Sequence, residues 1–154
     1  MLTLLLPAEF SEKLIVALRK AGHREIGGIL MAEHVGTNIF SVRDLTIHRQ
    51  GTIASFVRQI EDAVGVLRAF FNRSNHDYTK FNYIGEWHSH PCFEPEPSLR
   101  DDASMREIVG DVKTGATFAV LLIVKLGLKE KLHTSVHAYR PNGDKIRATL
   151  QIVD

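Results

Sequence analysis

Two histidines and an aspartate lie close together in the middle of the chain and have the side-chain types that bind a metal ion. His88 and His90 are two residues apart, so both imidazoles leave the same face of the preceding apolar run if that run is a strand. Pro91 would end the strand because proline has no N–H to donate. Ser98 and Asp101 follow where a helical pattern begins. Two imidazoles, one carboxylate and a water molecule form the open zinc site of hydrolases, so His88, His90 and Asp101 are the predicted Zn²⁺ ligands.

The spacing of these residues resembles a known motif. His-x-His-Pro, six residues and then Ser-x-x-Asp is similar to the JAMM motif of the MPN+ (JAB) zinc metalloproteases. That motif also includes an upstream glutamate on a strand, followed by small and apolar residues, and Glu25 with residues 26–30 fits this pattern. The resemblance spans essentially the whole chain. It implies the MPN fold, Zn²⁺ as cofactor and removal of ubiquitin or a ubiquitin-like modifier.

A zinc hydrolase needs protein groups beside the ligands. Zinc lowers the pKa of a bound water to about 7 and polarises the scissile carbonyl, but a carboxylate must still accept the proton of the water and pass it to the leaving amine. Glu25 is the candidate for this general base and acid, and the resemblance implies the same role. It also implies that Ser98 hydrogen-bonds the tetrahedral oxyanion, a suitable role for a hydroxyl.

Several residues of the motif have a second interpretation. Ser98-x-x-Asp101 is also the capping-box pattern that opens a helix, and a capped helix could fix an aspartate that faces a metal. Glu86 shares the strand face of His88, so it is an alternative base, ligand or partner of a ligand. Asp102 is an alternative ligand. The spacing from Ser98 favours Asp101 and predicts that Asp102 is a solvated residue of the first helical turn.

Composition limits the class of protein. Cys92 is the only cysteine, which excludes an internal disulfide and predicts a reducing, cytoplasmic compartment. We expect Cys92 to be neither ligand nor reactive thiol, and a nucleobase deaminase would need a second cysteine where Pro95 stands. The net charge of +1 gives no reason to expect a nucleic-acid partner. The apolar residues 1–6 are too few for a signal peptide or a membrane span, so no membrane partner is expected.

Periodicity predicts the elements that must position these residues. Strands are expected over 2–6, 26–32, 39–47, 81–87, 118–125, 131–139 and 145–153, and helices over 10–21, 56–72 and 99–115. The first helix should stop at Gly22. Two sets of helical residues should face the core: Ile60, Val64, Leu67 and Phe71, and then Met105, Ile108, Val109 and Val112. The fold class is α/β, with residues 1–154 as a single MPN (JAB)-like domain whose mixed, mostly antiparallel sheet packs with about three helices.

These observations predict an enzyme. The expected reaction is hydrolysis of the bond after the C-terminus of a ubiquitin-like modifier, in deconjugation or precursor processing, with the modifier tail in the active-site groove. Residues 85–88 resemble compact prokaryotic members, which makes a bacterial conjugation or anti-phage system the expected context. Glu94 and Glu96 could pair with basic residues of the tail or form a solvated acidic loop. The alternatives are a non-catalytic MPN scaffold, although such domains usually lack the ligands, and a zinc peptidase for small peptide conjugates.

Overall fold

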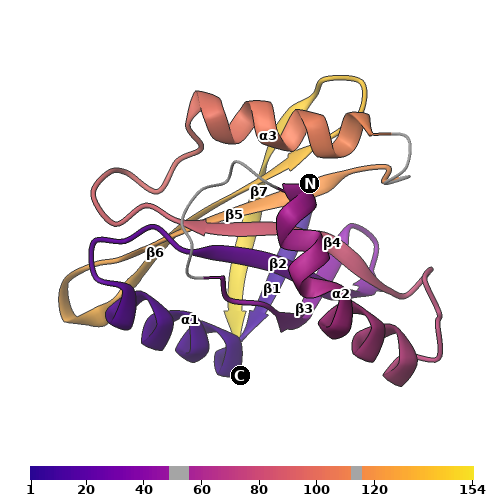
Figure 1. The fold of residues 1–154 in the computed structure, drawn as a ribbon, viewed down its shortest axis with the longest axis horizontal. Coiled ribbons are helices and arrows are strands. Elements are labelled where there is room, and N and C mark those ends of the chain that lie inside the picture. Colours follow the sequence, from indigo (N-terminus) through magenta and orange to yellow (C-terminus); the bar gives the residue numbers. More distant parts are fainter. Residues whose placement is uncertain (49–55, 112–115) are drawn as a thin grey trace.

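The computed structural model describes residues 1–48, 56–111 and 116–154, and the side chains of these ranges except 56–63. The described strands close into one barrel in the order β1-β3-β2-β4-β5-β6-β7, and three α-helices pack on it (Figure 1). The strands are β1 (Thr3–Pro7), β2 (Gly27–Gly36), β3 (Ile39–Leu45), β4 (Phe81–Ser89), β5 (Ala119–Leu126), β6 (Leu132–Tyr139) and β7 (Lys145–Val153). The helices are α1 (Ala8–Ala21), α2 (Phe56–Arg73) and α3 (Leu99–Gly110), with a one-turn 3₁₀ helix η2 (Leu128–Glu130).

The sheet is mixed. The pairs β2–β3, β2–β4, β5–β6 and β6–β7 are antiparallel, whereas β1–β3, β1–β7 and β4–β5 are parallel. The α/β class with a mixed, mostly antiparallel sheet and three helices is therefore confirmed. Closure into a barrel was not predicted. It arises because β1 pairs with both β3 and β7 and so joins the two ends of the sheet.

Strand β5 shows how the core is divided between the two faces of the sheet. Its residues are buried from Ala119 to Val124, and alternate side chains point to opposite faces. Val120, Leu122 and Val124 pack with the apolar face of α1, while Ala119, Leu121 and Ile123 pack with α3. Phe70 of α2 packs on Ile29 and Met31 of β2. Helix α1 therefore covers one face, and α2 and α3 cover the other.

Most predicted elements are confirmed within a few residues, and two details of the helices are wrong. Gly22 ends α1 as predicted, with a φ of 60° and its N–H donating to the Leu18 carbonyl. Helix α3 ends at Gly110, earlier than predicted, and Val112 lies outside the described residues. In the described part of α2, Val64 is exposed, Leu67 and Phe71 are partly buried against the core as predicted, and the fully packed side chain is Phe70. The side chain of Ile60 is also outside the described residues.

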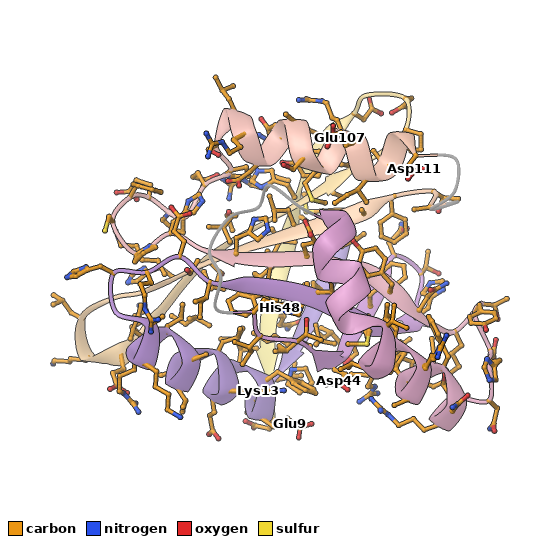
Figure 2. All side chains as sticks on the ribbon, viewed as in Figure 1. Glu9, Lys13, Asp44, His48, Glu107 and Asp111 are labelled. Atoms are coloured by element: carbon orange, nitrogen blue, oxygen red, sulfur yellow. The ribbon has the colours of Figure 1, made fainter. Side chains whose placement is uncertain are left out.

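Charged side chains lie on the exposed faces of α1 and α3. Glu9 and Lys13 on α1, and Glu107 at the end of α3, extend from the surface in Figure 2. Lys13 Nζ also donates to the carbonyl oxygen of Leu45 at 3.3 Å, which ties α1 to the end of β3. Among the described residues, none of the helices combines the length and apolar character needed to span a membrane.

Candidate metal and catalytic site

The end of β4 places three polar side chains inside the protein. Glu86, His88 and His90 are each at most 3% exposed, and they point to the face that α3 covers. Trp87, between them, points to the α1 side, and its Nε1 donates to the Thr46 carbonyl at 2.8 Å. His90 N–H still donates to the carbonyl of Val124 on β5 at 2.9 Å, so the ladder continues to the residue before the proline. The predicted shared face of the histidines is confirmed.

Helix α3 brings Asp101 to the histidines through its N-cap. Ser98 Oγ accepts from the Asp101 N–H at 3.1 Å, and Asp101 Oδ2 accepts from the Ser98 N–H at 2.8 Å. The capping-box interpretation is therefore confirmed. Asp101 is fully buried, and its cap fixes the carboxylate toward the end of β4. The cap is thus compatible with a second role for the same carboxylate at the site.

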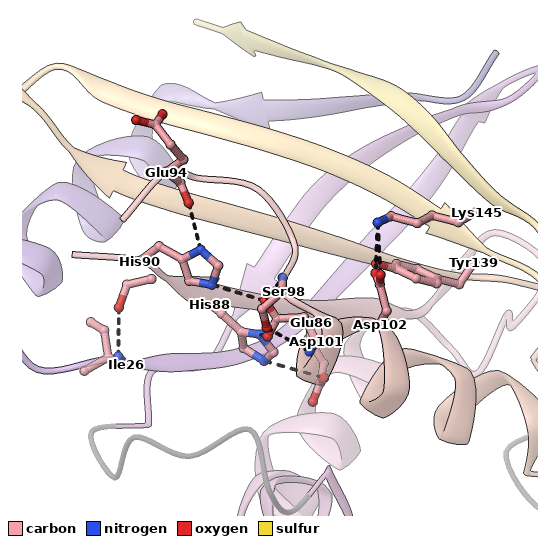
Figure 3. A network of polar contacts seen from close by, with 11 residues as sticks. Ile26, Glu86, His88, His90, Glu94, Ser98, Asp101, Asp102, Tyr139 and Lys145 are labelled. Carbon is pink, nitrogen blue, oxygen red and sulfur yellow. Dashed lines mark hydrogen bonds and ion pairs between the residues drawn. The ribbon is translucent and has the colours of Figure 1, made fainter. Parts of the chain in front are cut away.

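Each histidine points one ring nitrogen at Asp101 and the other at a further oxygen (Figure 3). The distances are 3.1 Å from His90 Nε2 to Asp101 Oδ2 and 3.6 Å from His88 Nδ1 to Asp101 Oδ1. His90 Nδ1 lies 2.9 Å from the Glu94 carbonyl oxygen, and His88 Nε2 lies 3.7 Å from Glu86 Oε2. The two rings therefore converge on one carboxylate.

The donor atoms fit a zinc ion. In the described part of the chain, both ring nitrogens of His88, Asp101 Oδ1 and Glu86 Oε2 are buried without a hydrogen-bond partner. Buried polar atoms are rarely left so, and a bound ion is one explanation. Zinc bond lengths of about 2.0–2.2 Å put tetrahedral ligand atoms about 3.3 Å apart. The unsatisfied pair of atoms, His88 Nδ1 and Asp101 Oδ1, is separated by 3.6 Å. In this structure, however, no three His, Cys, Asp or Glu side chains of the described ranges lie close enough together to hold a metal ion.

Glu25 lies beside His90. The prediction that Glu25 is part of a strand is wrong. Glu25 stands two residues before β2 begins and is half-buried. Ile26 N–H donates to Ser89 Oγ at 2.9 Å and Ser89 N–H donates to the Ile26 carbonyl at 2.9 Å, so the chain continues the β2–β4 pairing and brings Glu25 opposite His90. Gly27 permits this close approach to β4, because a Cβ there would lie 2.7 Å from the Trp87 carbonyl oxygen and 2.9 Å from His88 Cδ2.

The site holds its ionisable groups in different states. Burial raises the pKa of Glu86 to about 7, although the nearby His88 opposes this shift. Burial would also raise the pKa of Asp101, but its contacts with His88, His90 and the Ser98 N–H outweigh burial and lower it well below the usual value. For His90, burial lowers the pKa, whereas the contacts with Asp101 and the Glu94 carbonyl and the charge of Glu25 raise it overall. Of the two buried carboxylates Glu86 and Asp101, Asp101 is therefore the one better held as an anion.

The prediction that Asp102 is solvated is wrong. Asp102 is buried, accepts a hydrogen bond from the Tyr139 hydroxyl at 2.5 Å and pairs with Lys145 Nζ at 3.0 Å (Figure 3). Burial, then the bond to Asp102, raises the pKa of Tyr139. The spacing gave no sign of this because both partners come from β6 and β7, far along the chain. Asp102 thus faces away from the histidines and anchors α3.

The loop between the histidines and α3, together with the first residue of α3, borders the site. We define the site rim as Phe93, Glu94 and Leu99. The Phe93 ring meets the His90 ring edge to face at 5.1 Å, and Leu99 is 88% exposed. Glu94 and Glu96 of the predicted acidic loop are both exposed, and Glu96 pairs with Arg147 at 2.5 Å. The exposed Cys92 lies with its Sγ 4.0 Å from His23 Nδ1.

Known proteins resemble this chain in sequence and in fold. The family model described as prokaryotic homologs of the JAB domain matches residues 7–139. A protein of Enterobacter hormaechei subsp. hoffmannii (strain UCI 50) named CD-NTase/cGAS isopeptidase is 27% identical over 126 residues, which cover 79% of this chain and 67% of that protein. The solution structure of protein DSY2949 from Desulfitobacterium hafniense matches with a TM-score of 0.66 at 16% identity, covering 98% of this chain and 93% of that one. The chain therefore belongs to the prokaryotic JAB-domain family.

Proposed function

We propose that this chain is a zinc-dependent isopeptidase that hydrolyses the bond after the C-terminus of a ubiquitin-like modifier. The observation that carries the proposal is the convergence of His88 and His90 on the buried Asp101, with unsatisfied nitrogen and oxygen atoms between them and Glu25 opposite His90. Membership of the JAB family and a relative named as an isopeptidase support it.

In this proposal His88, His90 and Asp101 hold the zinc ion. When bound there, zinc would lower the pKa of a water molecule to about 7 and polarise the scissile carbonyl. The protein contributes the orientation of the ligands. Asp101 is fixed by the cap, and the His90 ring is fixed by the Glu94 carbonyl.

Two further residues have proposed roles in the reaction. Glu25, half-buried beside His90, accepts the proton of the attacking water and passes it to the leaving amine. Ser98 Oγ accepts from the Asp101 N–H, which leaves its own hydroxyl proton free to donate to the developing oxyanion. The exposed position of Ser98 at the start of α3 suits contact with a substrate.

The site rim suits an extended peptide tail. Phe93 beside His90 and Leu99 next to Ser98 offer exposed apolar surface, and Glu94 offers a negative charge. Since Arg147 engages Glu96, we expect Glu94 to meet a basic residue of the tail. The relative's name, CD-NTase/cGAS isopeptidase, supports conjugates of that kind of protein as substrates. As the context we propose a bacterial conjugation or anti-phage system in the cytoplasm.

The test uses a ubiquitin-like protein with a flexible C-terminal tail as the probe. It is presented in two forms, with a C-terminal peptide extension and with its tail joined to a lysine side chain, and the products are identified by mass spectrometry. We expect a cut directly after the last residue of the tail, lost with a chelator and restored by zinc. Binding without hydrolysis by the zinc-loaded protein would indicate a scaffold, and hydrolysis of small peptide conjugates alone would indicate a small-substrate peptidase.

A further inference from the structure

Glu86 is a buried carboxylate to which the proposed reaction gives no role. It is 1% exposed, and its Oε2 has no hydrogen-bond partner among the described side chains and backbone groups. It lies two residues before His88 on β4 and so shares its face of the sheet. His88 Nε2 lies 3.7 Å from Glu86 Oε2.

The surroundings of His90 suggest what Glu86 does. His90 directs Nε2 to Asp101, and its Nδ1 meets the Glu94 carbonyl at 2.9 Å, so an acceptor fixes the ring from behind. His88 has the same arrangement with the nitrogens exchanged, since Nδ1 faces Asp101 and Nε2 faces Glu86. A metal-binding imidazole commonly donates its other N–H to a carboxylate or carbonyl, which sets the orientation and tautomer of the ring.

We propose that Glu86 is the positioning residue for His88. Its carboxylate accepts a hydrogen bond from Nε2–H, so the unprotonated Nδ1 is held toward Asp101 as the metal-binding nitrogen. This inference rests on the proposed zinc site and deepens it. Glu86 acts through His88 and does not touch the substrate.

Because Glu86 is buried, its replacement should affect the stability of the metal-free protein and the zinc affinity in opposite directions. A carboxylate removed from water without a complete set of hydrogen bonds opposes folding, so a residue kept there only for stability would be a poor choice. Replacing it with the neutral glutamine of the same size should leave the metal-free protein as stable or more stable. The same replacement should weaken zinc binding, because an amide oxygen is a weaker acceptor for the Nε2–H.

The experiment measures zinc affinity by competition with a coloured chelator, together with the Tm of the metal-free protein. We expect Glu86→Gln to weaken zinc binding about 10-fold and Glu86→Ala up to about 100-fold, with one zinc still bound at saturation. The metal-free Tm of Glu86→Gln should equal or exceed that of the wild type. The matched control is Glu107→Gln on the exposed surface of α3, which should change neither quantity.

Four other results would overturn the positioning role of Glu86. Unchanged zinc affinity in both Glu86 variants would overturn the positioning role while leaving the zinc site intact. Loss of the bound zinc even at saturation would overturn it as well, because Glu86 would then be a ligand. A lower metal-free Tm with parallel loss of affinity would mark Glu86 as a structural residue. A wild-type protein that binds no zinc would overturn the proposed function and this inference together.

Discussion

Asp101 uses its two carboxylate oxygens differently. Oδ2 accepts from the Ser98 N–H and contacts His90, whereas Oδ1 faces His88 and has no hydrogen-bond partner in the described part of the chain. The first oxygen fixes the side chain and the second remains available to a cation. This division would let one Ser-x-x-Asp pattern serve both as a helix cap and as part of the proposed metal site.

The role of Glu25 can be separated from that of the ligands. Glu25→Gln keeps the size of the side chain but cannot accept a proton, so kcat for the modifier conjugate should fall about 10²–10⁴-fold. The zinc content should stay at the wild-type level because Glu25 is not a ligand. Steady-state kinetics and metal analysis on the same sample check both statements. Nearly full activity of Glu25→Gln, with Glu86→Gln inactive, would mean that Glu86 is the base.

Leu99 should contribute to binding of the tail. It is 88% exposed beside Ser98, so covering it with substrate would bury apolar surface worth about 1–2 kcal/mol. We therefore expect Leu99→Ser to raise KM about 5–30-fold with little change in kcat. Val35→Ser is the control, because Val35 is also exposed but lies at the far end of β2. Equal effects of the two substitutions would remove Leu99 from substrate binding.

Helix α3 is fixed at its N-terminus from two sides. Asp101 joins it to the end of β4, and Asp102 joins it to Tyr139 of β6 and to Lys145 of β7. Adjacent residues of the first turn therefore connect the helix to three strands. This anchoring sets the position of the cap and, with it, the position of the proposed third ligand.

Tyr139→Phe tests the second anchor. The substitution removes the hydroxyl that donates to the buried carboxylate of Asp102, so the free energy of unfolding should fall by about 1.5–3 kcal/mol. Urea denaturation measures this change. Tyr78→Phe removes a hydroxyl from an exposed side chain that contacts His76, and it should change stability by less than about 0.5 kcal/mol. A similar small effect at Tyr139 would show that Lys145 alone anchors Asp102.

The sequence predicts elements well where the signal is local. The strand before His88, the stop at Gly22 and the cap at Ser98 depend on neighbouring residues, and the structure has all three. The burial of Asp102 was missed because Tyr139 lies 37 positions later and only the fold brings it close. The role of the Glu94 carbonyl was missed because a backbone oxygen has no signature in the sequence. The order of the strands and the closure by β1 depend in the same way on distant pairings.

At the scale of the whole molecule, the barrel brings together parts of the site that are far apart in sequence. β2 and β4 pair so that Gly27 lies opposite His88. The carbonyl of Val124 on β5 accepts a hydrogen bond from the His90 N–H. Glu25, the histidines and α3 meet only because these pairings hold. Metal binding should therefore be coupled to the folding of the barrel.

Removal of the metal should destabilise the protein. An ion that binds only the folded state adds about 2.7 kcal/mol at a free concentration of 100 times its Kd. For a chain of this size that corresponds to roughly 5–11 °C in Tm. We expect one cooperative transition, as for a single domain, that moves down by this amount after treatment with a chelator. The His88→Ala, His90→Ala double variant should show no dependence of Tm on zinc, and an equal shift in that variant would place the ion elsewhere.

The metal content of the protein tests the central claim most directly. Elemental analysis of protein purified without added metal should give about one zinc per chain for the wild type, as two imidazoles and one carboxylate with a water ligand require. The double variant His88→Ala, His90→Ala should give almost none. A wild-type ratio near zero, or a full complement of zinc in the double variant, would contradict the assignment of His88, His90 and Asp101 as the ligands.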